Sequence, residues 1–174
     1  MATSLLMWVI TDTNSFFNTN SSPNSLLVAS ELMELWARHQ EIIINLFKKK
    51  SYSKIKLWWK VLEWLKNIKE NKIVWNIVPK SYFIETWSSD KDITWLLDEF
   101  LSSVNWSLVV FIIYELENWR IKATFRSKEN WVDLASFCEW LGWWWHKQAA
   151  WFIRTSGNIY EIEQEVINKL SCLV

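Results

Sequence analysis

An α/β fold with a mixed sheet is the architecture that this sequence predicts, on three observations. Segments in which apolar residues recur every three or four positions alternate with short runs of β-branched and aromatic residues, the pattern of helices alternating with strands. Two such runs, 108–116 and 120–126, follow each other across a short polar stretch and predict a β-hairpin. Hydrophobic residues make up 51% of the chain and charged residues 22%, a globular composition.

The first part of the chain, residues 1–47, is expected to form one strand and two helices. It enters through a short helix or extended piece and continues as an apolar strand at 8–10. The polar stretch 11–24 is expected to be a loop, after which Ser25 serves as the N-cap of a helix. A second helix is expected over 40–48.

The remainder is expected to form a helical linker over 48–72 and a larger α/β domain over 73–174. A basic and polar stretch at 48–53 is the joint between the two parts. The expected helices lie at 54–70, 90–104, 131–140 and from Asn158 onward, and the expected strands at 73–78, 82–85, 108–116, 120–126 and 151–154.

Charge and cysteine usage limit the range of functions. The formal net charge is zero, so any contact with nucleic acid has to be local. The lysine run 48–50 is interpreted as a solvated face, with a nucleic-acid contact as the alternative. Cys138 and Cys172 follow no metal-binding spacing and are expected to pack as small apolar groups in a reducing compartment. The longest apolar run, 108–114, is too short to cross a membrane, and no signal peptide is found, so a cytoplasmic location is expected.

Two residue counts are abnormal. Glycine occurs twice, whereas an average usage of ~7% corresponds to roughly a dozen glycines in a chain of this length. Tryptophan occurs sixteen times. The positions of the tryptophans suggest that the two anomalies have one cause.

Several tryptophans stand where the backbone needs glycine. The Asn-Trp pair at 118–119 lies between the hairpin strands, where both central residues of a type I′ turn need positive φ. Tryptophan is strained in that region and glycine is not. The same pair recurs at 105–106 and 130–131, between apparent helices and strands. Trp36 ends a helical pattern, where a left-handed glycine is expected.

The run 143–145 consists of three tryptophans directly after Gly142, and three adjacent indoles of ~150–250 Å² each do not fit easily into a short loop. The hypothesis is that most of these tryptophans are glycines in the living protein, because one codon that normally means stop is read as tryptophan in some genetic codes and as glycine in others. Trp58 and Trp75 lie in apolar, periodic surroundings that suit genuine tryptophan. The alternative is a chain that carries sixteen tryptophans.

Two motifs carry a resemblance to a known family. With tryptophan read as glycine, the stretch 120–152 contains an Arg-Ser pair that ends a strand, then a helix, then Gly-Gly-Gly-Gly-His and Ala-Ala-Gly. The segment 2–13 contains an apolar run that ends in an Asp-Thr pair. The Asp-Thr segment comes first along the chain, and the Arg-Ser and glycine motifs follow it. In this order and at roughly this spacing, the motifs resemble the C-terminal half of the DHH-family phosphoesterases. These metal-dependent enzymes hydrolyse phosphodiester or phosphomonoester bonds in small nucleotides and single-stranded nucleic acid.

The resemblance covers nearly the whole chain and is nearest to the oligoribonuclease and nucleotide-phosphatase branch of the family. It implies that 1–47 is the C-terminal remnant of a Rossmann-like DHH catalytic domain. It also implies that 73–174 is the DHH-associated substrate-binding domain. The implied partner is a nucleotide or a short single-stranded nucleic acid, with no membrane contact, and a homodimer is one implied assembly.

The resemblance assigns a metal role to one residue. Asp12 corresponds to the family's last metal-binding aspartate, and a carboxylate suits a hard divalent cation such as Mn²⁺ or Mg²⁺. In the family such ions come in pairs, activate water and offset charge on the phosphoryl group. The alternative is that Asp12 begins an Asx turn in the loop.

The resemblance assigns substrate contacts to two segments. Arg126 and Ser127 match the family's Arg-Ser pair, which contacts phosphate or sugar, and arginine binds phosphate bidentately. The alternative for Arg126 is a surface arginine that closes a strand. The substrate-binding glycine loop corresponds to Gly142, Trp143, Trp144, Trp145 and His146. If positions 143–145 are truly tryptophan, the backbone is shielded and no phosphate binding is expected.

The rest of the family's metal shell is missing. The sequence contains no His-x-x-x-Asp-x-Asp cluster and no Asp-His-His triplet, and one carboxylate does not hold two cations. The chain alone is therefore expected not to hydrolyse phosphoesters and is interpreted as a fragment of a phosphoesterase. Two other hypotheses remain open: a non-catalytic nucleotide or single-strand binding module, and a tryptophan-rich interaction or membrane-surface protein.

Overall fold

The computed structural model describes residues 1–17, 20–93, 96–99, 103–116, 118–129, 131–139 and 147–173. Asn130 and the loop 142–146, both named in the sequence predictions, lie outside the described residues. The chain divides into two compact units, residues 1–50 and residues 51–174. No helix among the described residues is long and apolar enough to cross a membrane.

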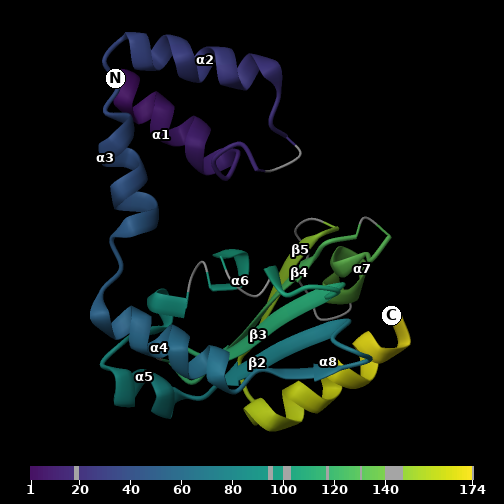
Figure 1. Cartoon of the computed structure of the whole chain (residues 1–174). Helices are drawn as coiled ribbons and strands as arrows, with labels where there is room; N and C mark the ends of the chain where they lie inside the picture. The colour runs from purple at the N-terminus through teal and green to yellow at the C-terminus, as the bar shows by residue number, and fades with distance from the viewer. Residues whose placement is uncertain are drawn as a thin grey trace. The chain divides into compact units, whose positions relative to one another are not determined.

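The first unit is helical (Figure 1). Its elements are α1 (Ala2–Asp12), α2 (Pro23–Glu34), α3 (His39–Ile43) and the π-helix η1 (Ile44–Lys48). Its small core consists of Leu6, Ile10, Ala29, Leu32 and Ile42.

The predicted strand at 8–10 is wrong, because these residues belong to α1. Leu6 and Ile10 are buried four residues apart, on one stripe of the helix, while Trp8 between them is 65% exposed. A strand pairing would have buried Trp8 together with Ile10, so the helical period decides the conformation.

The helix α2 begins earlier than predicted. Ser22 rather than Ser25 is its N-cap, and Pro23 occupies the first helical position, where its fixed φ suits a helix. The two serines form a reciprocal capping box: Ser22 Oγ accepts from Ser25 N–H at 3.2 Å, and Ser25 Oγ accepts from Ser22 N–H at 3.0 Å.

The second unit is built on a five-stranded mixed sheet, which confirms the predicted α/β class. The strands lie in the order β1-β2-β3-β4-β5; β2 and β3 are parallel, and the other neighbouring pairs are antiparallel. Their bounds are β1 (Lys66–Ile68), β2 (Ile73–Val78), β3 (Val109–Glu115), β4 (Ile121–Ser127) and β5 (Ala149–Arg154).

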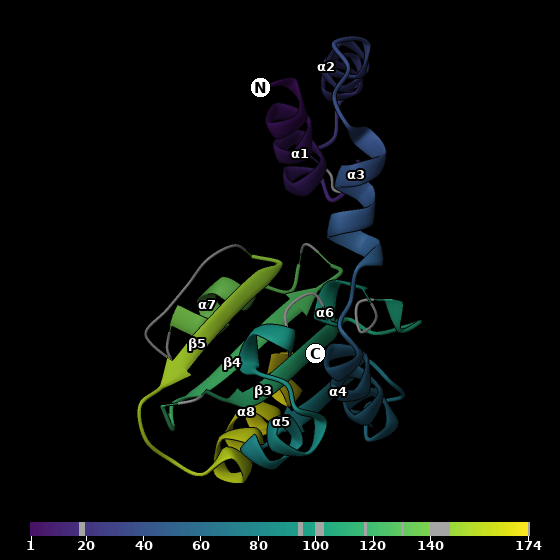
Figure 2. The ribbon, with the colours of Figure 1, turned by 90° about the vertical axis from the view of Figure 1, so that its left-hand side faces the viewer.

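Helices pack on both faces of this sheet (Figures 1 and 2). On one face α7 (Leu134–Glu139) and α8 (Ile159–Leu173) cover the inward side chains of β2 to β5. On the other face, α4 (Tyr52–Glu63), α5 (Lys80–Thr86), the 3-10 helix η2 (Asp90–Ile93) and α6 (Leu96–Glu99) pack against β2 and β3. Among the described residues, none of β4 or β5 belongs to this second core, so within the described part of the chain this side of β4 and β5 is open.

Three predicted elements of this unit differ from the structure. Where one helix is expected over 90–104, the described residues form the 3-10 helix η2 and the short helix α6, and Val104 is not helical. The other two differences concern a helix and a strand. The helix expected over 54–70 ends at Glu63, and β1 follows as an edge strand paired with β2. The strand expected at 82–85 lies inside α5, where Phe83 and Thr86 are buried three residues apart. In both places a short segment fits either period; pairing with β2 favours the strand β1, and packing against α4 favours the helix α5.

The predicted left-handed backbone is confirmed at three tryptophans: φ is 62° at Trp36, 65° at Trp106 and 62° at Trp119. At Trp131, where the same Asn-Trp pair suggested a glycine-type position, φ is not positive. The hairpin turn is longer than the predicted two-residue turn. Leu116 N–H donates to Arg120 C=O at 2.7 Å, so the loop spans three residues. A left-handed residue at the last position of a three-residue loop is a common hairpin form.

Candidate functional site

A row of polar side chains crosses the open part of the sheet. Along β4, Lys122, Thr124 and Arg126 alternate with buried residues, so the three share the face that α7 and α8 do not cover. All three are half-buried. The sequence itself encodes this face, because strict alternation of polar and apolar residues places every second side chain on it.

Arg126 is held in place by Asp98 of α6. Its Nε donates to Asp98 Oδ1 at 2.8 Å and its Nη2 donates to Asp98 Oδ2 at 3.3 Å, while Nη1 donates to the Phe125 carbonyl at 3.0 Å. Both charged side chains are 31% exposed. A guanidinium carries five N–H donors, and these three hydrogen bonds use three of them. A fixed guanidinium binds an anion with little further loss of side-chain freedom.

Lys122 places a second cation on the same row. Burial lowers the pKa of its ammonium; the nearby Asp90 works against this lowering, and Arg126 adds to it. Within the described residues no carboxylate lies within ion-pair distance of Lys122, and its Nζ lies 4.9 Å from the centre of the Trp151 ring. An anion bound beside this half-buried ammonium would stabilise its charged form, because an opposite charge offsets the free-energy cost of burying it.

The side chain of Ser127 lies on the other face of β4 from Arg126. It is 9% exposed, its hydroxyl donates to the Glu129 carbonyl at 3.1 Å, and it accepts from Glu129 N–H at 3.2 Å. The geometry is that of a residue that shapes the turn after β4. The structure thus separates the side chains of the Arg-Ser pair, and a substrate contact of Ser127 stays a prediction.

The predicted glycine loop, Gly142 to His146, lies outside the described residues, and its substrate role stays a prediction. The register of β5 nevertheless relates its C-terminal side to the polar row. Ala149, three residues after His146, pairs with Arg126 across the sheet. Ser127 N–H also donates to the Gln148 carbonyl at 2.9 Å.

Asp12 lies at the C-terminal end of α1 rather than at the end of a strand. Its Oδ2 accepts from Asn20 Nδ2 at 3.0 Å. In the parts of the chain that the structure describes, no group of three or more His, Cys, Asp and Glu side chains could hold a metal ion. These residues alone do not build a metal site, and Asp12 would need further ligands from elsewhere.

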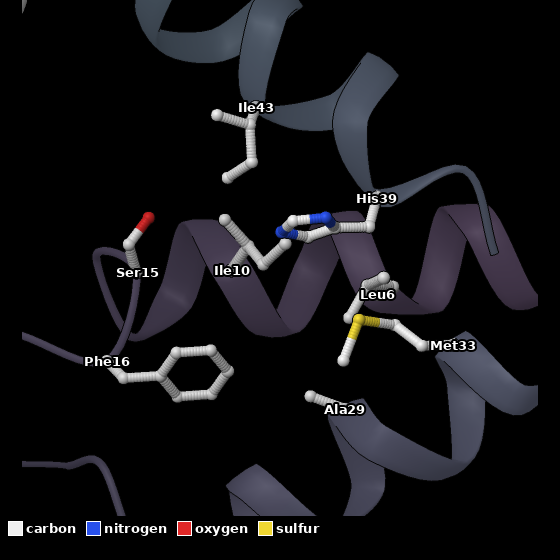
Figure 3. A pocket seen from close by; sticks show the side chains of 8 residues that line it. All are labelled: Leu6, Ile10, Ser15, Phe16, Ala29, Met33, His39 and Ile43. Atoms are coloured by element: carbon white, nitrogen blue, oxygen red, sulfur yellow. The ribbon is translucent and has the colours of Figure 1, made fainter.

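The first unit contains an apolar pocket of about 240 Å³, lined by residues that include Leu6, Ile10, Phe16, Met33 and His39 (Figure 3). Its polar side chains are the His39 imidazole and the Ser15 hydroxyl, and no acidic side chain lines it. An otherwise apolar lining with no lysine or arginine suits a phosphorylated ligand poorly, so the polar row on β4 is the better candidate site.

Sequence reasoning identified Arg126 but missed Asp98 and Lys122. The alternation along 121–127 could have identified Lys122, because it predicts that Lys122 and Arg126 share a face. Asp98 had no such signal, since its place beside Arg126 depends on how α6 packs against the sheet.

Several solved structures resemble the chain, and two of them have an informative description. An exopolyphosphatase-related protein from Bacteroides fragilis superposes with a TM-score of 0.78 at 16% identity, over 92% of this chain and 47% of that one. The pGpG-specific phosphodiesterase PggH from Vibrio cholerae superposes with a TM-score of 0.55 at 11% identity, over 97% of this chain and 58% of that one. No family model and no curated protein sequence matches this chain.

The chain therefore shares its fold with these two proteins, at a sequence identity that establishes the fold alone. The chain spans about half the length of the two solved structures that it resembles.

Proposed function

We propose that this chain is the nucleotide-binding half of a DHH-type, metal-dependent phosphoesterase that acts on small nucleotides or short oligonucleotides. The observation that carries the proposal is the row of Lys122 and Arg126 on the open face of the sheet, with Arg126 fixed by Asp98. The names of the two resembling structures, an exopolyphosphatase-related protein and a pGpG-specific phosphodiesterase, favour a phosphorylated ligand at such a face.

The two cations suit a ligand with more than one phosphate. Lys122 and Arg126 lie four residues apart on one strand, which separates their Cα atoms by roughly 13 Å at ~3.3 Å per residue. Thr124 lies between them and can donate or accept a hydrogen bond. A dinucleotide or short oligonucleotide, with phosphates and hydroxyls spaced along a chain, matches this row better than a single inorganic phosphate.

The catalytic metals are proposed to depend on residues outside this chain. Asp12 is the one family metal ligand present, and the described residues do not surround it with others. When bound in the parent enzyme, paired Mn²⁺ or Mg²⁺ ions would supply activated water and charge neutralisation.

The first unit also suits a partial domain. Large apolar side chains on α1 and α2 are exposed, among them Leu5 at 49%, Leu26 at 54% and Leu27 at 61%. Such a concentration on a unit of fifty residues indicates a surface that another segment covers.

A second candidate function is a binding module that needs no metal, with homodimerisation as a possible assembly. The observation that favours it is the lack of a metal-ligand group in the described part of the chain. The two functions differ in one property of the parent protein: a phosphoesterase turns over its ligand in Mn²⁺, and a binding module releases it unchanged.

The binding step is tested by calorimetric titration with a 5′-phosphorylated dinucleotide. Two forms of the chain are compared, one as printed and one with glycine at 143–145, because bulky side chains there would shield the loop backbone. The proposal expects binding by the glycine form. Replacing Arg126 with Met should weaken that binding roughly 10- to 100-fold, the effect of losing a charge-assisted contact of ~1.5–3 kcal/mol.

Arg120 provides the matched control. It is an exposed arginine on the same hairpin, six residues away, and lies outside the polar row. Arg120→Met should leave the affinity within about twofold, since a distant exposed charge contributes little. Equal weakening by the two substitutions, or no binding by the glycine form, would defeat the assignment of the site.

A further inference from the structure

Two helices end in the same backbone arrangement with tryptophan at the left-handed position. After α2, Trp36 N–H donates to Met33 C=O and Ala37 N–H donates to Leu32 C=O, both at 3.0 Å. After α5, Trp87 has a φ of 56°. Trp87 N–H donates to the carbonyl three residues before it. The N–H of the next residue donates to the carbonyl five residues before that residue.

This pair of hydrogen bonds defines the Schellman motif. The left-handed residue in that motif is usually glycine, because a β-carbon crowds the backbone there. Trp36 and Trp87 each occupy this position. Trp87 was not singled out by the sequence pattern, so the structure adds it to the suspected positions.

Two further tryptophans occupy left-handed positions in turns. Trp106 has a φ of 65° in the turn before β3, and its own N–H donates to Asn105 Oδ1 at 3.1 Å. Trp119 has a φ of 62° at the last position of the hairpin loop between β3 and β4. Glycine is the residue that such loops favour at this position.

The four indoles gain little from their surroundings. Their exposed fractions are 90% at Trp36, 89% at Trp87, 79% at Trp106 and 73% at Trp119. The centre of the Trp119 ring lies 4.1 Å from Lys80 Nζ. A tryptophan normally offsets its conformational cost by burying apolar area, and these four side chains do so weakly.

Two other tryptophans have the opposite character. Trp58 and Trp75 are each 4% exposed and have helical and extended backbones. Trp58 Nε1 donates to the Asp92 carbonyl at 2.7 Å, and Trp75 Nε1 donates to Glu163 Oε1 at 2.6 Å. A buried indole whose N–H has a partner is what genuine tryptophan requires.

The left-handed region is enriched in tryptophan. Of the sixteen tryptophans, five (residues 95, 140 and 143–145) lie outside the described residues, which leaves eleven, and four of these eleven have positive φ. The other six non-glycine residues with positive φ fall in two loops, 14–16 and 69–71. None of those six is tryptophan, so the isolated left-handed positions at helix ends and turns are the ones that tryptophan occupies.

We infer that glycine is the functional residue at positions 36, 87, 106 and 119, and that positions 58 and 75 are genuine tryptophans. The two groups follow from backbone conformation and burial, independently of any ligand. The inference therefore stands or falls separately from the proposed function. It also implies two different codons in the gene, one for each group.

The direct test is peptide mass spectrometry of this protein purified from its native cells. Peptides that cover residues 36, 87, 106 and 119 should carry glycine, and those that cover residues 58 and 75 should carry tryptophan. Tryptophan at any of the first four positions, or glycine at 58 or 75, overturns the inference.

The gene sequence gives a second test that does not depend on folding. The codons at positions 36, 87, 106 and 119 should be the reassigned stop codon, and those at 58 and 75 the ordinary tryptophan codon. Ordinary tryptophan codons at the first four positions contradict the inference, whatever a recombinant chain does.

Discussion

Replacing Trp87 with glycine should stabilise the second unit, although the substitution removes a large apolar side chain from the surface of that unit. A non-glycine residue in the left-handed region costs roughly 1–2 kcal/mol. Against this gain, glycine adds about 0.4–1 kcal/mol of freedom to the unfolded chain. Because Trp87 is 89% exposed, little apolar burial is lost.

The net expectation for Trp87→Gly is a gain of about 0.5–1 kcal/mol in the free energy of unfolding. For a unit that spans residues 51–174, this gain corresponds to a rise of about 2–4 °C in Tm. Thermal unfolding followed by circular dichroism measures the shift directly.

Two controls separate backbone strain from the removal of an exposed indole. Trp87→Ala also removes the indole but keeps a β-carbon at positive φ, so it should give no comparable gain. Trp59 is 73% exposed inside α4, where Trp59→Gly should cost about 0.5 kcal/mol of helix propensity. If Trp59→Gly or Trp87→Ala raised Tm as much as Trp87→Gly, the strain argument would be refuted.

Three further predictions concern buried and charged groups of the second unit. Trp75→Phe should lower the free energy of unfolding, measured in urea, by about 1–3 kcal/mol. The substitution removes a hydrogen-bond donor from the carboxylate of Glu163, which is 4% exposed. An unchanged unfolding midpoint would show that this hydrogen bond does not stabilise the fold. Burial raises the pKa of the Cys138 thiol to about 12, whereas a thiol in the unfolded chain titrates near ~8.5. Between these pH values the unfolded state loses the proton and the folded state keeps it. The free energy of unfolding should therefore fall by about 1.4 kcal/mol per pH unit in this range. That fall, measured by denaturation at several pH values, should disappear in Cys138→Ala. Arg126→Lys should weaken dinucleotide binding nearly as much as Arg126→Met, because lysine lacks the planar guanidinium that can bind Asp98 and a phosphate together. Unchanged affinity of Arg126→Lys in calorimetry would mean that the positive charge alone suffices.

The sequence predicted the hairpin strands and the α/β class because both depend on local signals. The runs 108–116 and 120–126 are long enough to show their period, and the structure places strands within a residue of each. Trp36, Trp106 and Trp119 were identified from turn chemistry, which acts over three or four residues.

The errors came where a short apolar segment fits two periods. Residues 8–10 and 82–85 each hold too few apolar positions to distinguish a helix from a strand, and packing partners far along the chain decide between them. The pairing of Asp98 with Arg126 likewise depends on how distant parts of the chain pack. The sequence therefore identifies Arg126 on its strand but does not identify Asp98 as the residue that holds it in place.

The central claim, that this chain binds a phosphorylated nucleotide without a catalytic metal shell of its own, is tested by one paired measurement. The form with glycine at 143–145 is mixed with a labelled 5′-phosphorylated dinucleotide and Mn²⁺, and bound and hydrolysed label are measured in the same sample. Saturable binding with no turnover is the predicted result, and hydrolysis by the chain alone, or no binding at all, would contradict it.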